Sequence, residues 1–304
     1  MGLGAWYDRE RLALVAHREL ERQLDMTQDL AAATRFYESM NLAETRPEDF
    51  LQRCHALGGG EVILTGIRFK GMNIEMPFVD LVAASFELSD GQRLAETLKV
   101  IERDYNALKP KWIRIMQWRG EGVSWPTDSA VTPDIAYLAS PTSKLKALPP
   151  PQGCEILEVR RCQDLDFYPV YRREHDAFRA ASSFGQDVPI STREDLARCL
   201  EEGLLYEARV EGSWAGLIAA AAESFYGISA LCIHEEILCE PLRGKGLGPA
   251  LQRKMIDAVD KDILIYGTID ARNLASLKTA KRVGREQVAQ RLFCTLSTAR
   301  SALD

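Results

Sequence analysis

Apolar and polar positions follow two different periods in the second half of the chain. Residues 228–239 are rich in β-branched and apolar side chains, which is typical of a strand. Further on, apolar residues recur at helical spacing at Ala250, Leu251, Met255, Ile256 and Val259. The pattern therefore predicts a strand that leads into a helix through the segment Arg243–Gly248.

Other elements of this half follow from the same periods. Turn-forming pairs at Glu211-Gly212 and Tyr226-Gly227 separate apolar runs and predict an antiparallel meander. The runs of the meander are Leu204–Val210, Trp214–Glu223 and Tyr226–Cys239. The remaining predictions are strands at Glu155–Arg160 and Ile263–Thr268 and helices at Asp164–Arg179, Thr192–Glu202 and Asn273–Gly284.

The first half shows a similar order of elements. Its periodic segments predict helices at Glu10–Gln23, Thr27–Met40, Pro47–Leu57 and Asp90–Leu108, and strands at Glu61–Phe69, Pro77–Leu88 and Lys111–Trp118. The loop Ser89–Arg93 has one glycine and one acid, which suits a phosphate poorly. We predict a degenerate copy of the second half that binds no cofactor; an unrelated α+β domain stays open.

The best boundary between the two halves is the run Leu148-Pro-Pro-Pro-Gln-Gly153, which predicts a stiff, extended connector. A chain of 304 residues is about twice the length of a common domain. We therefore expect an N-terminal α/β domain at 1–148, a linker at 149–153 and a second domain at 154–304.

The segment Arg243–Gly248 has the features of a phosphate-binding loop. Its three glycines leave backbone N–H groups uncovered, the following helix adds a partial positive charge, and Arg243 and Lys245 add full charges. The segment lacks the Gly-Lys-Ser/Thr ending of a P-loop and the G-x-G-x-x-G spacing of a dinucleotide fold. A pyrophosphate is the expected ligand.

The spelling Arg243-x-x-Gly246-x-Gly248 resembles the R/Q-x-x-G-x-G/A loop of GCN5-related N-acetyltransferases, and Asn273–Gly284 looks like that family's next helix. The resemblance covers roughly Glu155–Leu296. It implies an α+β fold with a mixed, mostly antiparallel sheet flanked by helices, here in two tandem domains. It also implies acetyl-CoA or another acyl-CoA as co-substrate, held by residues Ile237, Leu238, Cys239, Arg243, Gly244, Lys245, Gly246, Leu247, Gly248, Asn273 and Ser276.

Direct transfer of an acyl group to an amine requires a general base. Alternation along the strand places His234 and Glu236 on one face and Glu235 on the other. Histidine is the residue type that ordinarily exchanges a proton near neutral pH, and His234 lies where some acetyltransferases of this fold carry a histidine. Glu236 is a second candidate base or could orient His234, and Glu235 would need burial to act as a base. A structural role for all three stays open.

Two positions depart from the family pattern. The helix position at which many members carry a tyrosine that protonates the thiolate is Ala280, and the aromatic residue after the closing glycine is replaced by Arg285. Tyr206, Tyr226 or Tyr266 could supply the acid. Alternatively, the thiolate leaves unassisted, since a thiol with a pKa of about 8.5 is a fair leaving group. A donor other than coenzyme A also stays open.

Composition excludes several classes of protein. Contents of 46% hydrophobic and 27% charged residues are typical of globular chains, and the net charge of −6 disfavours a nucleic-acid surface. The seven cysteines are scattered without C-x-x-C spacing, so we expect no disulfide framework and no metal site. No apolar run is long enough to span a membrane, and no secretory signal is recognisable, so we expect a cytoplasmic location.

The leading prediction is an N-acyltransferase that acts on a primary amine of a small molecule or a peptide. Cys232 and Cys239 are expected to be small buried residues, so a covalent cysteine intermediate is disfavoured. One alternative is a transferase with a carrier-protein or tRNA donor. Another is a coenzyme A-binding sensor without catalysis, and a homodimer stays open.

Overall fold

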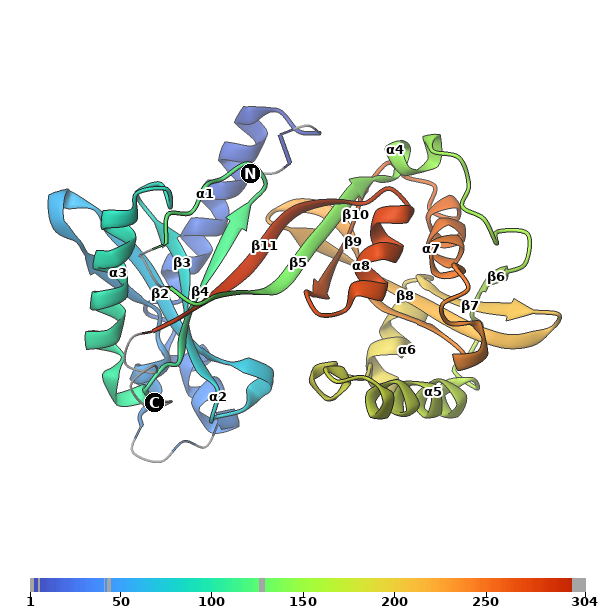
Figure 1. Ribbon diagram of the computed structural model, residues 1–304, viewed down its shortest axis with the longest axis horizontal. Coiled ribbons are helices and arrows are strands. Elements are labelled where there is room, and N and C mark those ends of the chain that lie inside the picture. The colour runs from blue at the N-terminus through green and yellow to red at the C-terminus, as the bar shows by residue number, and fades with distance from the viewer. Residues whose placement is uncertain (1–2, 5, 41, 43–44, 126–128, 297–304) are drawn as a thin grey trace. The chain divides into compact units, whose positions relative to one another are not determined.

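The computed structural model describes the whole chain except residues 1–2, 5, 41, 43–44, 126–128 and 297–304 (Figure 1). The chain divides into two compact units, which are Met1–Ile135 with Ala289–Asp304 and Ala136–Val288. Each unit combines helices with a mixed, mostly antiparallel set of strands, so the predicted fold class is confirmed. The predicted linker at 149–153 lies inside the second unit.

The first unit follows the predicted order closely. Its strands are hydrogen-bonded in the order β1-β2-β3-β4-β11, and β3 and β4 form a parallel pair. The elements are α1 (Arg9–Asp25), α2 (Leu30–Met40), β1 (Arg53–Ala56), β2 (Val62–Phe69), β3 (Pro77–Ala84), α3 (Gly91–Asp104), β4 (Trp112–Trp118) and the C-terminal strand β11 (Glu286–Thr295).

The predicted helix at Pro47–Leu57 is wrong. Pro47–Phe50 forms one 3₁₀ turn, and the chain then continues as β1, which pairs antiparallel with β2. The strand is held by contacts that the local sequence does not reveal. His55 Nδ1 lies 2.9 Å from Asp104 Oδ2, and His55 Nε2 lies 2.9 Å from Thr65 Oγ1. Tertiary hydrogen bonds therefore override the local helical pattern.

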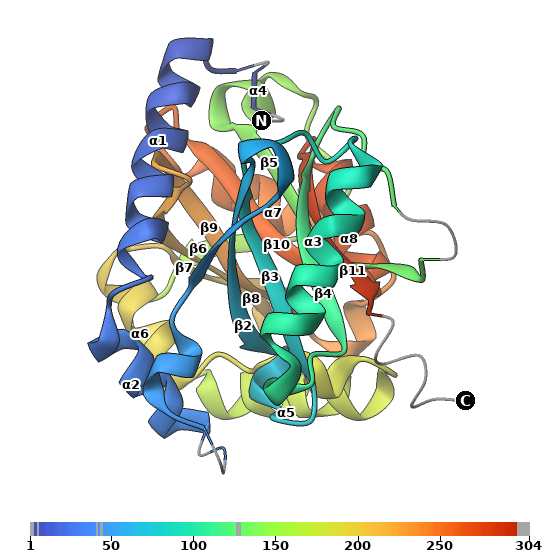
Figure 2. The ribbon, with the colours of Figure 1, turned by 90° about the vertical axis from the view of Figure 1, so that its left-hand side faces the viewer.

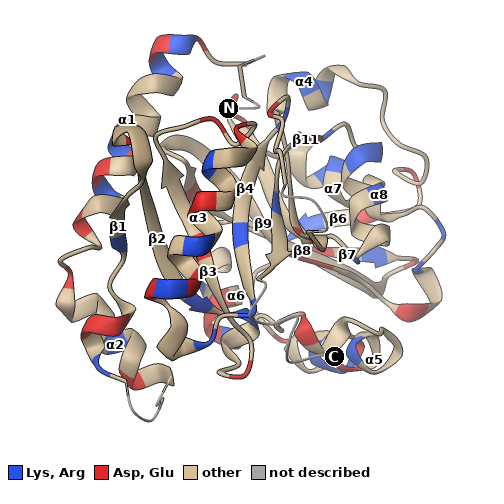
Figure 3. Ribbon diagram, turned by 60° about the vertical axis from the view of Figure 1, so that its left-hand side comes forward, with Lys and Arg blue, Asp and Glu red and all other residues tan. Residues whose placement is uncertain are grey.

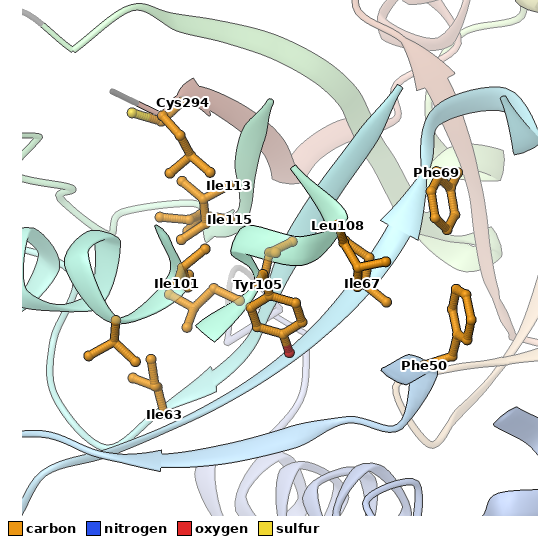
Figure 4. Close-up of a cluster of buried hydrophobic side chains, with 14 of the residues drawn as sticks. Phe50, Ile63, Ile67, Phe69, Ile101, Tyr105, Leu108, Ile113, Ile115 and Cys294 are labelled. Atoms are coloured by element: carbon orange, nitrogen blue, oxygen red, sulfur yellow. The ribbon is translucent and has the colours of Figure 1, made fainter. Parts of the chain in front are cut away.

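The core of the first unit lies between α3 and the central strands. Figure 2 shows α3 in front of β3 and β4, and Figure 4 shows Ile101 of α3 beside Ile113 and Ile115 of β4. Tyr105, just after α3, is 1% exposed and shares a hydrogen bond of 2.8 Å with Thr65 Oγ1. Burial of these side chains is the main stabilising contribution to this unit.

The second unit has its strands in the order β5-β10-β9-β8-β7-β6, with β9 and β10 parallel. The predicted hairpin turns are present, since Glu211, Gly212, Tyr226 and Gly227 all have positive φ. The elements are β5 (Val131–Pro141), α4 (Thr142–Ala147), β6 (Glu158–Arg161), α5 (Tyr168–Ala181), α6 (Arg193–Glu201), β7 (Leu205–Val210), β8 (Ser213–Phe225), β9 (Ile228–Leu238), α7 (Gly248–Asp257), β10 (Leu264–Asp270) and α8 (Leu274–Arg282).

Different helices cover the two faces of this sheet. Leu217 and Ala219 of β8 pack with buried residues of α5 and α6. Their neighbours Ile218 and Ala220 pack with buried residues of α7. Because successive side chains of a strand point to opposite faces, α5 and α6 cover one face and α7 covers the other.

The surface charges are mixed in sign along the exposed helices. Figure 3 shows acidic and basic residues interspersed along α1 and α3. Where the structure describes the chain, it contains no helix of the length and apolar character that crossing a lipid bilayer requires.

Candidate functional site

The two parallel strands β9 and β10 pair along only part of their length. Within the described residues their ladder runs from Leu264 opposite Ala230 to Tyr266 opposite Cys232. Both strands continue beyond it, β10 to Asp270 and β9 to Leu238. Past Cys232, β9 therefore presents an edge to the gap between the strands, and backbone groups at such an edge can pair with an extended ligand.

A β-bulge lies where the strands part. Ala219 of β8 pairs with Glu235, and Ala220 pairs with Ile233, so His234 has no partner on β8. The bulge reverses the alternation that the sequence predicts after this point. Glu235 contacts Tyr171 of α5, whereas Glu236 contacts Gln252 of α7.

The prediction that Glu236 shares a face with His234 is therefore wrong. The extra residue shifts the side-chain period by one position, and Glu235 takes the face of His234 instead. The two candidate bases His234 and Glu235 thus face α5, and Glu236 lies on the side of α7.

The predicted phosphate loop leads directly into α7. Gly244 and Gly246 have φ values of 74° and 79°, and a Cβ at either position would meet open space. The N–H groups of residues 244–248 donate no hydrogen bond within the described part of the chain. Leu247, at the N-cap of α7, provides no side-chain cap. The first turn of this helix is therefore free to receive an anion.

The corresponding turn of the first unit is closed to an anion. The carboxylate of Asp90 caps α3 and accepts hydrogen bonds of 3.1 Å from the N–H groups of Gln92 and Arg93. Those N–H groups are satisfied, and a negative charge already occupies the positive end of the helix. The turn before α3 thus differs from the loop before α7 in both its charge and its satisfied N–H groups.

The two cations of the loop differ in their contacts: Arg243 is hydrogen-bonded within the chain and Lys245 is exposed. Arg243 Nε donates to Leu238 O over 2.7 Å, and its Nη2 lies 3.2 Å from a carboxylate oxygen of Glu174 on α5. The same carboxylate accepts the N–H of Glu240 at 3.0 Å. Arg243 therefore anchors the start of the loop, whereas Lys245 is exposed and places a positive charge at the surface of the loop.

The other predicted cofactor residues lie at both sides of the loop. Asn273 caps α8, with its side-chain oxygen accepting the N–H of Ser276 at 3.1 Å. The N–H of Cys239 donates to Ala215 O at 2.9 Å, and the buried Ile237 packs toward α5 and α6. Cys239 and Ile237 therefore stabilise the sheet in this structure, and the carbonyl of Leu238 accepts a hydrogen bond from Arg243.

His234 belongs to a polar cluster on the face that α5 covers. Its Nε2 lies 2.6 Å from Glu223 Oε1 on β8, and the two side chains are 37% and 35% exposed. Tyr266 of β10 donates to the other oxygen of the same carboxylate. Glu223 thereby fixes the imidazole and leaves its Nδ1 available to accept a proton.

Cys232 extends this cluster. Its sulfur, a ring nitrogen of His234 and a carboxylate oxygen of Glu223 lie within 4.8 Å of one another. This set of sulfur, nitrogen and oxygen ligands is of a kind that binds zinc, although the prediction for this chain is that it binds no metal. Burial raises the pKa of the Cys232 thiol to about 12, so the unmetallated thiol is a poor nucleophile.

Glu235 is held by several donors. Tyr171 Oη donates to its carboxylate at 2.6 Å, Ser191 Oγ lies at 3.4 Å, and the N–H of Glu236 donates at 3.0 Å. Burial raises the pKa of the Glu235 carboxyl despite these hydrogen bonds. Its lone pairs are largely used, so it is a weaker candidate base than His234.

Glu236 lies at the start of α7. Its Oε2 accepts a hydrogen bond of 2.5 Å from Gln252, and its Oε1 lies 3.2 Å from the place a Cβ would take on Gly248. Burial raises the pKa of this carboxyl to about 7, against the opposing effects of Gln252 and Arg285. Near neutral pH, Glu236 can therefore hold a proton on the loop side of the sheet.

Sequence reasoning missed the partners of these residues. Glu223 precedes the turn before β9, Glu174 lies on a helix predicted for its aromatic contacts, and Gln252 is 0% exposed in α7. Register places Glu223 opposite Ala230, four residues before His234, yet its carboxylate lies 2.6 Å from the imidazole. The sequence signal for one of these partners was Gln252, a polar residue on the apolar face of the predicted helix.

Comparisons with known proteins concern the overall fold. No protein-family model matches the chain. A search of curated proteins likewise gave no match. Among solved structures, the chain is similar to an acetyltransferase of the GNAT family from Colwellia psychrerythraea, with a TM-score of 0.49, 11% identity, and coverage of 77% of this chain and 81% of that one.

Two other solved structures are similar over much of their length. One is a GCN5-related N-acetyltransferase from Sphaerobacter thermophilus, with a TM-score of 0.48 and 16% identity; the match covers 79% of this chain and 78% of that chain. The other is a tandem GNAT protein from the clavulanic acid biosynthesis pathway, with a TM-score of 0.43 and 11% identity; the match covers 88% of this chain and 95% of that chain. At such identities, conclusions about function rest on the residues of this chain.

Proposed function

We propose that the second unit is an N-acyltransferase that moves an acyl group from an acyl-CoA to a primary amine. One observation carries the proposal: the gap between β9 and β10 opens beside an uncapped, glycine-rich helix start, and proton-transfer groups lie on both faces of β9 at that point. A thioester in the gap would have donor-binding groups on one side and a base on the other.

The donor is held by the loop and the strand edge. The N–H groups of residues 244–248 and the positive end of α7 receive the pyrophosphate, with Lys245 adding a charge. Arg243 acts indirectly, because its bonds to Leu238 and Glu174 hold the loop in place. The pantetheine arm pairs with the free edge of β9, and acetyl-CoA is the simplest donor that fits.

The acceptor amine approaches from the face that α5 covers. His234 Nδ1 takes a proton from the amine while the nitrogen forms a bond to the thioester carbon. Glu223 orients the imidazole through its contact of 2.6 Å with Nε2 and stabilises the imidazolium that forms. The carbon–sulfur bond then breaks, and the electron pair leaves with the sulfur.

Glu236 is the proton donor for the departing thiolate. It lies on the loop side of β9, and its pKa of about 7 keeps a protonated fraction at neutral pH. This role removes the need for the tyrosine that Ala280 replaces. Tyr266 donates to Glu223, and the buried Tyr206 accepts a hydrogen bond of 3.4 Å from Arg161 Nε.

The test is an assay of the full chain with acetyl-CoA and a panel of primary amines, including amino acids, aminosugars, arylalkylamines and peptides. Thiol release and the mass of the acylated product are measured together. We expect transfer to at least one class of amine, with intersecting double-reciprocal plots that indicate a ternary complex. Binding of coenzyme A without transfer to any amine would instead support a sensor without catalysis.

A further inference from the structure

Arg285 is a buried cation without a hydrogen-bond partner at two of its three nitrogens. The residue is 3% exposed, and neither Nε nor Nη1 has a partner within the described chain. Burial lowers the pKa of its guanidinium to about 10, so the side chain still carries its charge at neutral pH. A buried charge without partners is costly, which makes its retention informative.

The guanidinium lies where β9 and β10 part. A Cβ on Gly267 would come within 2.8 Å of Arg285 Nη1 and 3.6 Å of Ile233 O. Gly267 directly follows Tyr266, the last β10 residue that pairs with β9. The absence of a side chain at Gly267 is therefore what leaves room for the guanidinium in the gap.

Arg285 lies on the donor side of the sheet. Tyr266 faces Glu223 and His234, so the next residue, Gly267, faces the opposite side. Glu236, on that side, attracts Arg285 electrostatically without forming an ion pair within the described residues. The cation thus lies near the start of α7 and is separated by the sheet from the base that serves the acceptor.

We propose that Arg285 binds a carboxylate at the far end of the acyl group, so that the donor is a coenzyme A monothioester of a dicarboxylic acid, of the malonyl to glutaryl class. This inference rests on the proposed function. The planar guanidinium matches a carboxylate with two parallel hydrogen bonds. The phosphates of the donor are received at the exposed loop, which leaves the buried cation for the acyl end.

The chemistry of transfer is unchanged by this assignment. The amine nitrogen bonds to the thioester carbon, the carbon–sulfur bond breaks, and the remote carboxylate keeps its charge throughout. A carboxylate beside Glu236 favours the protonated form of that carboxyl, which is the form that donates to the thiolate.

The test compares succinyl-CoA with butyryl-CoA, which has the same number of acyl carbons and no charge on the acyl group. Each is titrated calorimetrically into the full chain, alongside free coenzyme A. We expect succinyl-CoA to bind at least about tenfold more tightly than butyryl-CoA, as a charge-assisted pair in a buried site provides. In Arg285→Gln the two esters should bind within about twofold of each other.

Two further variants control for indirect effects. Arg282→Gln removes the same charge from the exposed end of α8 and should keep the preference for succinyl-CoA. Arg285→Met fills the site with apolar atoms and should lose the preference while its melting temperature is equal or higher, because an unpaired buried charge has been removed.

The outcomes separate this inference from the proposed function. Equal or tighter binding of butyryl-CoA, or a succinyl preference that survives in Arg285→Gln, overturns the role of Arg285 and leaves the acyltransferase proposal intact. Failure of coenzyme A and both esters to bind overturns the proposed function, and the donor assignment falls with it.

Discussion

His234 combines two local features that a catalytic base needs. It is the extra residue of the bulge, so no pairing with β8 ties its backbone, and Glu223 holds its ring from the neighbouring strand. We predict that His234→Gln lowers kcat by about 100-fold, the usual contribution of general base catalysis, with an unchanged Kd for the acyl-CoA. Steady-state kinetics with parallel calorimetry measures both quantities.

Glu223 provides a graded comparison. Glu223→Gln keeps the size of the side chain but loses the charge that stabilises the imidazolium, so kcat should fall by about tenfold. Unchanged kcat in His234→Gln would contradict the assignment and would make Glu235 the remaining candidate base on that face.

The pKa of Glu236 makes stability depend on pH. Its folded pKa of about 7 exceeds the value of about 4.3 in an unfolded chain, so the folded state binds the extra proton. The free energy of unfolding therefore decreases as pH rises from about 4.3 to about 7, and the penalty is then constant. We predict that Glu236→Gln is more stable than the unaltered protein at pH 8, by roughly 1–3 kcal/mol.

Urea denaturation at pH 4.5 and pH 8 checks this prediction. At pH 4.5 Glu236 is protonated in the folded state and roughly half ionised in the unfolded state, so the free energies of unfolding of the two proteins should differ by less than about 1 kcal/mol. A Glu236→Gln variant that is less stable at pH 8 would show that the ionised carboxylate is stabilising, in conflict with its burial.

At this scale the sequence identifies the right segment and misassigns its faces. The glycines, Arg243 and the His234-Glu235-Glu236 run can be read directly. The bulge cannot, because it depends on how β8 and β9 pair, and it moves Glu236 to the opposite face from His234. Arg285 can be recognised in the sequence as a departure from a family pattern, but its burial depends on tertiary packing and cannot be predicted locally.

Elements with strong local signals were predicted well. The hairpins of the β7–β9 meander have Gly at turns with positive φ, and α6 begins with a capping box of Thr192 and Asp195. The region Pro47–Leu57 failed because its strand depends on contacts with residues 104 and 65, which are remote in sequence. Local propensity decides an element only where no such contact competes.

The cap of α8 offers a test at the scale of one element. Asn273→Ala removes the hydrogen bond to the N–H of Ser276 and should reduce the free energy of unfolding by about 1 kcal/mol. Asn273→Asp keeps a capping oxygen and should leave stability nearly unchanged. Chemical denaturation distinguishes the two, and equal losses in both variants would contradict a capping role.

The division of the whole molecule could not be read from proline content. The run at 149–153 looks like a linker, yet the chain passes between units near residues 135 and 289. The last described strand, β11, pairs with β4 from Ala289 to Thr295. Cys294 of this strand and Leu296, just after it, are buried in the core of the first unit. Pairing between two strands so far apart in the sequence leaves no local signal.

A fragment of residues 1–148 should therefore be incomplete. It lacks β11, and the loss of several buried side chains at about 2 kcal/mol or more each is comparable with the whole stability of a domain. We predict that it shows no cooperative unfolding by circular dichroism. Adding a synthetic peptide of residues 286–296 should restore a cooperative transition, and cooperative unfolding of the fragment alone would contradict the role of β11.

We propose that the loop before α7 binds the pyrophosphate of coenzyme A. The most direct measurement is calorimetric titration of coenzyme A into the unaltered protein and into Lys245→Glu, with Lys99→Glu on α3 as a control of equal charge change. We expect saturable binding of coenzyme A that Lys245→Glu weakens by about tenfold or more and that Lys99→Glu leaves unchanged. No detectable binding to the unaltered protein, or equal weakening by both variants, would contradict it.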